Sequence, residues 1–464
     1  MATPRGGRLH TLCASGNGLA YISAVTYQLG VDLGTTYTAA AIHRDGKAEI
    51  VSLGDRAAAI PSVVFLRSDE EILTGDSANR RGITEPNRVA REFKRRVGDT
   101  TPLLLGGTPY SAEALMAKLL RWVVATVSKQ EGGPPDEIAV SHPANWGPFK
   151  TDLLGQAVRL ADLGHAEMIT EPEAAAIYYA STERVEPGDV IAVYDLGGGT
   201  FDAAVLRKSE DGFEILGAPE GIERMGGIDF DEAVFAHVRR AVGTKIEELD
   251  PEDETALAAV GRLREECIQA KEALSTDTDV AIPVLLPNVQ TEVRLTRAEF
   301  EAMVRPALTE TIGALRRALD AAKLQPADVK AVLLVGGSSR IPLVAQMVGA
   351  EIGRPVAVDA HPKHAIALGA ALAAAGTEEV AEVVAPVVPE QEATMAATRA
   401  ERDEEPTVAE PVEPPTRVAE PTPAFVRTEP APAKAEAQMS MPLLVVSAIL
   451  AVGAVGALVF RLVA

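Results

Sequence analysis

The stretch Val31-Asp32-Leu33-Gly34-Thr35-Thr36-Tyr37 returns later in the chain, with more glycines, as Tyr194-Asp195-Leu196-Gly197-Gly198-Gly199-Thr200-Phe201-Asp202. In both places an apolar strand runs into an aspartate, a leucine and a glycine-rich turn with threonine. A second apolar run follows each turn, at residues 39–42 and 203–206. This order predicts two β-hairpins, each with a turn that carries an acid, glycines and hydroxyls.

The residue types in these turns suit a polyphosphate. Glycines let backbone amides approach an anion because no Cβ intervenes, and the threonine hydroxyls add donors. Asp32 and Asp195, at the strand ends, suit a hydrated Mg²⁺ ion, which keeps several waters and takes few carboxylates. One such turn alone would fit an ordinary tight hairpin. Two copies in the same setting favour a clamp that holds a polyphosphate from both sides.

A third segment, residues 332–342, reads as a buried strand, a Gly336-Gly337 turn and the start of a helix. Taken alone, it fits a plain strand–helix loop with a capping serine as well as it fits a site for a base and ribose. In the second case the glycines make room for a flat purine. Beside two phosphate turns, the adenosine site is the favoured interpretation.

In their order and spacing, the three segments resemble those of the actin-like ATPase superfamily. The individual residues within them resemble its 70-kDa heat-shock (DnaK-like) chaperone branch. Further matching segments are Lys94–Gly98, Glu171–Ala176, Gly226–Asp231 and Arg262–Ser275. The resemblance covers roughly residues 27–375. It implies an α/β fold: a two-lobed actin-like ATPase built from duplicated ribonuclease-H-like domains, with the nucleotide between the lobes.

The resemblance also implies roles for individual residues, with ATP or ADP and Mg²⁺ as cofactors. The expected catalytic residues are Lys94, Glu171, Asp202 and Thr200. Asp32 and Asp195 are expected to contact the metal through water. The expected nucleotide-binding residues are Gly34, Thr35, Thr36, Tyr37, Gly197, Gly198, Gly199, Gly226, Gly227, Lys271, Ser275, Gly336, Gly337, Ser338 and Arg340. Two of these residues have simpler readings: Lys94 fits a solvated basic turn, and Glu171, before Pro172, fits a helix start.

Composition narrows the class of protein. A chain of 464 residues suggests two or three units, and 47% hydrophobic residues are ample for a core. The formal charge of −22 argues against nonspecific nucleic-acid binding. The only cysteines, Cys13 and Cys267, lie in unrelated contexts, so we expect a reducing compartment, no disulfide and no catalytic thiol.

Strands and helices alternate from residue 27 to 375, as in layered α/β proteins. We predict strands at 28–33, 39–42, 137–141, 190–195, 203–206 and 331–335. We predict helices at 111–128, 149–163, 173–179, 230–242, 252–274, 297–324 and 365–375. The two phosphate turns mark a diverged duplication, which we divide into lobe I, about 27–207, and lobe II, about 208–376.

Outside this region the sequence changes character. Residues 1–26 lack a continuous apolar core of signal-peptide length, and we expect them to be disordered or to reflect a mis-assigned start. Residues 377–440 contain ten prolines, and fourteen acids against five bases. They predict a disordered acidic linker, because such a segment buries too little apolar surface to offset chain ordering.

Residues 441–463 form an apolar run in which Arg461 is the only charge. As a helix, the run from Pro442 spans roughly 33 Å, close to the roughly 30 Å of a bilayer's hydrocarbon. A buried core helix is the alternative, but a segment that is apolar all round favours a transmembrane helix. Because ATP and reducing conditions belong to the cytoplasm, we expect a single-pass protein of the cell membrane with a cytoplasmic ATPase domain.

Some positions depart from the family's pattern. Tyr37 stands where a small polar residue often follows the threonine pair, and Ile268 stands where the adenine-side helix usually has a glutamate. Lys363 replaces an acid, and Thr151 stands where an arginine usually follows Pro143 by eight residues. With these departures we expect Mg-ATP binding but slow hydrolysis.

Two functions remain open from the sequence. The family's chaperones carry a peptide-binding domain after the ATPase domain, and we expect none here, because the acidic segment follows Gly376 directly. The first function is a membrane-anchored DnaK-like ATPase that hydrolyses ATP slowly, and Lys94 favours it. The second is a nucleotide-sensing scaffold or regulatory membrane protein whose lobes close on ATP and recruit a partner, and the missing domain favours it. The sequence leaves open whether a protein partner or co-chaperone binds, and it does not identify one.

Overall fold

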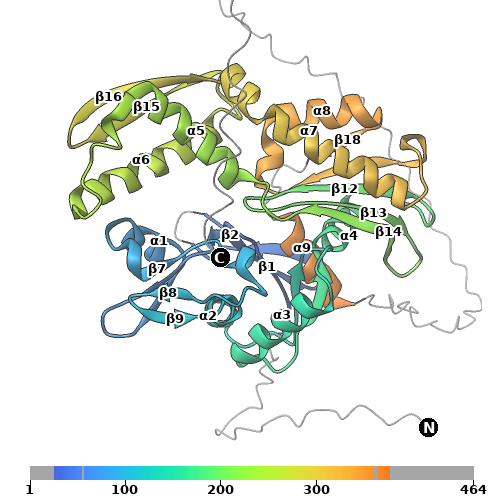
Figure 1. The fold of residues 1–464 in the computed structure, drawn as a ribbon. Coiled ribbons are helices and arrows are strands. Elements are labelled where there is room, and N and C mark those ends of the chain that lie inside the picture. Colours follow the sequence, from blue (N-terminus) through green and yellow to red (C-terminus); the bar gives the residue numbers. More distant parts are fainter. Residues whose placement is uncertain (1–25, 55–56, 359–363, 377–464) are drawn as a thin grey trace, which may run out of the picture. The chain divides into compact units, whose positions relative to one another are not determined.

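A computed structural model describes residues 26–54, 57–358 and 364–376 of the chain (Figure 1). Apart from Thr26, the predictions for residues 1–26, 377–440 and 441–463 fall outside these ranges. Among the described residues, no helix has the length and apolar character needed to cross a bilayer.

The first β-sheet holds the first predicted phosphate turn. Its strand order is β11-β10-β1-β2-β3, and β4 also pairs with β2. Strands β1 to β3 form antiparallel pairs, whereas β10 and β11 add parallel to β1. The strands are β1 (Gln28–Leu33), β2 (Tyr37–Arg44), β3 (Lys47–Val51), β4 (Ile60–Pro61), β10 (Glu137–His142) and β11 (Glu167–Thr170).

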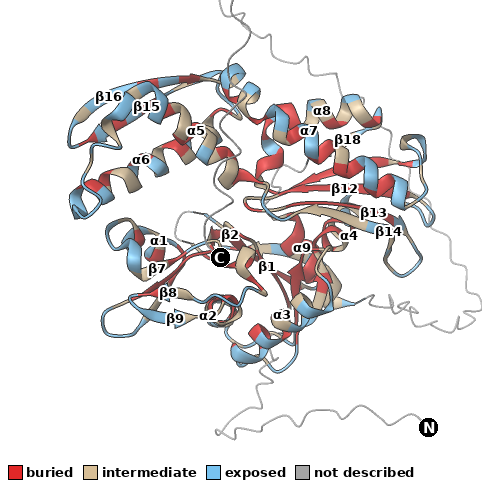
Figure 2. Cartoon of the chain, in the orientation of Figure 1, coloured by how far each residue is buried: buried red, intermediate tan, exposed pale blue. Residues whose placement is uncertain are grey.

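The second sheet repeats this topology around the second turn. Its order is β14-β13-β12-β17-β18, again with three antiparallel strands followed by two parallel ones. Every residue of β12 is buried, as expected for a central strand with both faces covered (Figure 2). The strands are β12 (Val190–Leu196), β13 (Phe201–Lys208), β14 (Phe213–Ile222), β17 (Ala331–Val335) and β18 (Val356–Val358).

The helices complete the duplication. In each half the third strand leads, through an insertion, to a long helix, a parallel strand, a helix, the last strand and a final helix. These helices are α2 (Ala112–Glu131), α3 (Pro148–Leu160) and α4 (Glu171–Thr182) in the first half and α7 (Arg297–Ala321), α8 (Pro342–Ile352) and α9 (Ala365–Ala375) in the second. Local signals set their ends: Thr296 and Glu299 form a capping box at the start of α7, and Gly132, at φ +79°, follows α2.

Each half carries an insertion that forms one side of the cleft. The first insertion contains β5 (Val64–Leu66), β6 (Ile72–Thr74), α1 (Gly75–Thr84), β7 (Val89–Ala90), β8 (Leu103–Leu105) and β9 (Thr108–Tyr110), with short 3₁₀ turns at Pro86–Arg88 and Phe93–Arg96. The second contains α5 (Gly227–Val242), α6 (Glu254–Ala273), β15 (Asp279–Leu286) and β16 (Val289–Thr296). The insertions meet where α1 and α6 approach, because a Cβ at Gly261 would lie 3.7 Å from Ile83.

Helices α4 and α9 lie between the two sheets (Figure 1). Two glycines let α9 approach α4 on one side and β1 on the other. A Cβ at Gly369 in α9 would lie 1.7 Å from the Ala174 carbonyl oxygen in α4, and one at Gly30 in β1 would lie 2.2 Å from the Ala371 nitrogen. The last helix of the second half therefore packs on the sheet of the first half.

The mixed α/β architecture and the predicted strands are confirmed, with β1 and β17 matching to the residue. The lobe boundary near residue 207 is wrong, because β12 pairs with β17 and β13 pairs with β12, which places both strands in the second sheet. The second lobe thus begins near Val190, and the second turn belongs to it. The pairing of β12 with β17 joins residues more than a hundred positions apart. Local sequence patterns carry no signal for such a contact, so they do not show that the hairpin belongs to the second lobe.

At the α4–α9 contact, replacing a glycine by alanine should destabilise the protein, although alanine favours helix formation more than glycine does. Gly369→Ala should lower the free energy of unfolding by at least about 2 kcal/mol, because the new methyl group overlaps the α4 backbone. Gly313→Ala, inside α7 with only the flexible Arg317 nearby, is the matched control and should be neutral or stabilising. Thermal denaturation of both variants measures the effect. Equal stability of the two would contradict this account of the α4–α9 contact.

Candidate functional site

The two predicted phosphate turns lie against each other across the cleft. A Cβ at Gly198 would lie 1.8 Å from Thr36 Oγ1, and one at Gly199 would lie 2.4 Å from Thr35 Cγ2. Glycine is therefore required on the second turn because the threonine side chains of the first occupy that space. The buried Thr36 Oγ1 has no hydrogen-bond partner, which leaves it available to a ligand.

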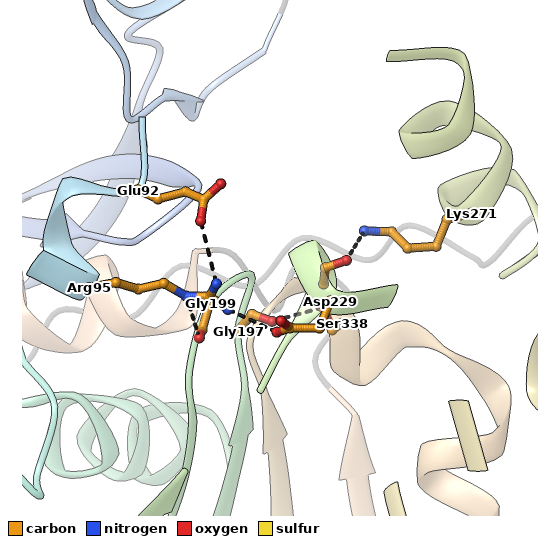
Figure 3. A network of polar contacts seen from close by, with 8 residues as sticks. Glu92, Arg95, Gly197, Gly199, Asp229, Lys271 and Ser338 are labelled. Carbon is orange, nitrogen blue, oxygen red and sulfur yellow. Dashed lines mark hydrogen bonds and ion pairs between the residues drawn. The ribbon is translucent and has the colours of Figure 1, made fainter. Parts of the chain in front are cut away.

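Neighbouring loops hold the second turn in place. The Gly227 and Ile228 amides donate to the carbonyl oxygens of Gly197 and Gly198 at 3.1 and 2.8 Å. The Ser338 hydroxyl donates to the Gly197 carbonyl oxygen at 2.8 Å (Figure 3). The Gly227 amide and the Ser338 hydroxyl thus support the turn, although both residues line the cleft.

Four buried carboxylates gather at the base of these turns around one lysine. Asp32 and Asp195 end β1 and β12, Asp202 lies opposite Asp195 in the β12–β13 pair, and Glu171 begins α4. Lys94 Nζ lies 2.5 Å from Glu171 Oε1, and both side chains are at most 7% exposed. The Ser141 hydroxyl donates to Asp32 Oδ1 at 2.9 Å.

Burial dominates the protonation of this cluster. It raises the pKa of Asp202 to about 8, with Glu171 adding to the effect, and the pKa of Asp32 to about 6 despite the opposing charge of Lys94. Burial, followed by the nearby Glu171 and Asp202, raises the pKa of Asp195 well above its ordinary value. Burial disfavours the charge on Lys94, but Glu171 and Asp32 together raise its pKa. One ammonium cannot balance all four carboxylates in their ionised form, and the raised pKa values mean that bound protons reduce the negative charge of the cluster.

A hydrated divalent cation would balance these carboxylates once they ionise. Within the described ranges, no three or more acidic, histidine or cysteine side chains are arranged to hold a metal ion among themselves. The buried Asp202 Oδ1 has no hydrogen-bond partner. Mg²⁺ needs few protein ligands because it keeps water and binds phosphate oxygens. Asp32 and Asp195, which both line the cleft, fit contact through water.

Arg95, next to Lys94, connects the two lobes. Its Nε donates to the Gly199 carbonyl oxygen at 2.7 Å and its Nη2 to Asp229 Oδ2 at 2.9 Å, while Glu92 lies 3.4 Å from Nη1 (Figure 3). Glu92 has φ +55°, a left-handed conformation that is uncommon outside glycine. The Lys94 segment is thereby attached directly to the second phosphate turn.

Helix α6 supplies the predicted adenosine side of the cleft. Ile268, Lys271 and Ser275 line the cleft from this helix and the turn after it. Lys271 Nζ pairs with Asp231 at 2.7 Å and donates to the Gly227 carbonyl oxygen at 3.2 Å. Cys267, on the same helix, is buried among apolar residues, and burial raises the pKa of its thiol to about 12.

Most residues predicted for the site line one continuous cleft. These are Asp32, Gly34, Thr35, Thr36, Tyr37, Lys94, Glu171, Asp195, Gly197, Gly198, Thr200, Gly227, Lys271, Ser275, Gly336, Gly337 and Ser338. Four predicted residues are outside the lining. Gly199, Gly226 and Asp202 lie directly behind it in the packed turns, and Arg340 is exposed on the segment after Gly337.

The cleft also contains residues that the sequence did not single out. They include Pro61, Ser62, Val63, Asn79, Arg91, Glu92, Ile228, Asp231, Glu265, Glu272, Ile341 and Ile366. Several come from the first insertion, where no helix or strand was predicted. Ser62 is the clearest omission, since its hydroxyl donates to the Gly34 carbonyl oxygen at 2.7 Å and its amide to that of Thr36 at 2.8 Å. A lone serine after a proline gives no sequence signal for that role.

Comparison with known proteins identifies the family. The family model described as "Hsp70 protein" matches residues 28–103 and 102–390. The chain belongs to the Hsp70 family. It is 31% identical over 367 residues to the protein named "Chaperone protein DnaK" of Thermotoga petrophila and, equally, to that of Thermotoga maritima.

These alignments cover 76% of this chain and 60% of each relative. The chain therefore spans about three fifths of the length of the curated Hsp70 relatives it matches. Hsp70 proteins in general bind ATP and ADP with Mg²⁺. The predicted resemblance to the 70-kDa heat-shock branch is confirmed.

The raised pKa of Asp202 predicts that replacing its carboxyl group by a neutral amide stabilises the protein, and more so at higher pH. The folded protein keeps this proton up to about pH 8, whereas the unfolded chain loses it near pH 4. Stability from this group therefore falls as the pH rises through that window. Asp202→Asn removes the loss, so the increase in Tm without nucleotide or Mg²⁺ should be larger at pH 8 than at pH 5.5. Asp152→Asn, exposed on α3, is the control, and an equal Tm change at both pH values for Asp202→Asn would refute the prediction.

Proposed function

We propose that the cleft binds Mg-ATP and hydrolyses it slowly. The observation that carries this proposal is the opposition of two glycine–threonine turns directly above the buried Lys94–Glu171 pair. Neutral turns with backbone donors suit the phosphates, and the ammonium lies where negative charge must be balanced. The Hsp70 membership of the chain supports the same ligand.

Phosphoryl transfer depends mainly on positioning and charge stabilisation. The backbone amides and hydroxyls of the turns, including Thr35 and Thr200, would hold the phosphate oxygens. Lys94 would stabilise charge near the terminal phosphate, and Glu171 and Asp202 would accept hydrogen bonds from the attacking water. Bound Mg²⁺ would neutralise phosphate charge, with Asp32 and Asp195 contacting its waters.

We further propose that residues 441–463 anchor the protein in the cell membrane with the ATPase domain in the cytoplasm. Support comes from the sequence: the segment is apolar, Arg461 is its only charge, and its length suits a bilayer. Residues 377–440 would then serve as a tether. As a flexible coil, a segment of this length has a root-mean-square reach of roughly 40–50 Å.

Lys94→Ala tests the catalytic proposal. Hydrolysis in a single turnover should fall by about 100-fold or more, because removing a preorganised charge costs roughly that much in comparable sites. Mg-ATP affinity, measured by calorimetry, should change far less, since the turn backbone remains. Lys47→Ala, on the exposed end of β3, is the control and should behave like the parent protein.

Other outcomes of this experiment point elsewhere. No binding of ATP or ADP by the parent protein would reject the cleft as a nucleotide site. Tight binding with no turnover in either the parent or Lys94→Ala would favour the nucleotide-sensing scaffold, in which lobe closure recruits a partner. In that case the Arg95 contacts between the lobes are the first place to look for the closed state.

Removal of residues 441–464 tests the anchor. The truncated protein should move from the membrane fraction to the soluble fraction and keep its nucleotide affinity, because the cleft lies wholly within residues 32–366. Fractionation of cells that express either form measures this. Sedimentation of the truncated form with membranes, or digestion of the ATPase domain by protease added outside intact cells, would show that the proposed topology is wrong.

A further inference from the structure

An aromatic ring lies beside the lysine at the base of the cleft. Lys94 Nζ is 6.0 Å from the centre of the Trp146 ring, within the range of a cation–π interaction. The lysine side chain is 7% exposed and bonds Glu171 at 2.5 Å. A carboxylate and an aromatic ring thus both border this ammonium. Trp146 does not line the cleft, so its effect on a ligand passes through Lys94.

The turn that carries Trp146 fixes the ring in place. The Trp146 amide donates to the Pro143 carbonyl oxygen at 3.2 Å, and His142 Nδ1 contacts the same oxygen at 2.9 Å. The His142 ring stacks on the indole with centroids 6.3 Å apart and an interplanar angle of 17°. Farther along, Lys150 pairs with Glu223, which follows β14 in the second lobe. The His142 ring and the Pro143 carbonyl oxygen therefore hold the turn that carries the indole.

A ring at this position does something that a second carboxylate would not do. Its negative face attracts the ammonium without forming a directional hydrogen bond and without adding a further buried acid to the cluster. The attraction strengthens when water is excluded, and Lys94 is buried. The ring can therefore attract the Lys94 ammonium in addition to Glu171, and it leaves the remaining N–H donors of the ammonium available.

We propose that Trp146 is a positioning residue that orients the Lys94 ammonium for phosphoryl transfer. The inference rests on the proposed ATPase function and adds one residue to it. The simpler account gives Trp146 a packing role only, since it also contacts the apolar core of the first lobe. The chain's other tryptophan, Trp122 in α2, packs on that same core, and no cation lies over its ring among the described residues. Trp122 is therefore the natural control.

The test uses fluorinated tryptophan in the full-length Trp122→Phe variant, where Trp146 is the remaining tryptophan. Fluorine atoms added one by one withdraw charge from the ring face and barely change its shape, so folding is preserved. Single-turnover ATP hydrolysis should fall stepwise, to about tenfold below the parent at the highest substitution, while the Kd for Mg-ATP stays within about twofold.

Trp146→Leu should show a similar loss in rate, and Trp146→Phe should recover most of it. Trp122→Leu should lower Tm without slowing hydrolysis.

If the protein hydrolyses ATP and fluorination does not change the single-turnover rate, the inference is overturned and the proposed function stands. Trp146→Phe as slow as Trp146→Leu also overturns it, since then the whole indole shape matters and not the ring face. A parent protein that binds Mg-ATP but never hydrolyses it overturns the ATPase proposal, and this inference with it.

Discussion

Buried charge at one point constrains the rest of this structure. Lys94 faces four carboxylates in a region where each side chain is less than a tenth exposed. Burying ions costs several kcal/mol each unless partners are placed with good geometry. The strands that end in Asp32 and Asp195, the pairing that sets Asp202 opposite Asp195, and the helix that begins at Glu171 all deliver side chains to this point. One lysine cannot balance four ionised carboxylates, so this point has room for a further cation.

The duplication explains how two aspartates come to face each other. Each half builds a sheet on the same order of five strands, to which β4 adds a sixth in the first half, and in each the first hairpin carries an aspartate and a glycine turn. Placing the two copies around a pair of packed helices brings the turns together. The insertions then differ: the first supplies Lys94 and Arg95, and the second supplies α6. Symmetry thus provides the two glycine–threonine turns and their aspartates, while the asymmetric parts provide Lys94 and the α6 side of the cleft.

The sequence predicted the elements whose signal is local. The hairpins at Asp32 and Asp195 and the strand before Gly336 carry strong apolar runs and distinctive turns, and the structure shows all three. The sequence did not reveal contacts made over long distances, such as Arg95 with Gly199 and Asp229, or Ser62 with the first turn. The short strands and α1 of the first insertion also escaped prediction, because two- and three-residue strands give too little periodicity. Arg340, which the motif predicts to bind the nucleotide, lies outside the cleft lining and is exposed, so its role stays a prediction.

The packing of α9 on the first sheet has a consequence for how the chain acquires its structure. Strand β1 is complete by residue 33, yet one of its faces is covered by α9, which ends at Ala375. During synthesis at roughly 5–20 residues per second, the first sheet must wait about 17–70 seconds for its cover. The apolar face that α9 buries in the finished structure stays uncovered throughout that interval. The two halves therefore complete folding together, and the earliest-made part of this protein is among the last to be protected.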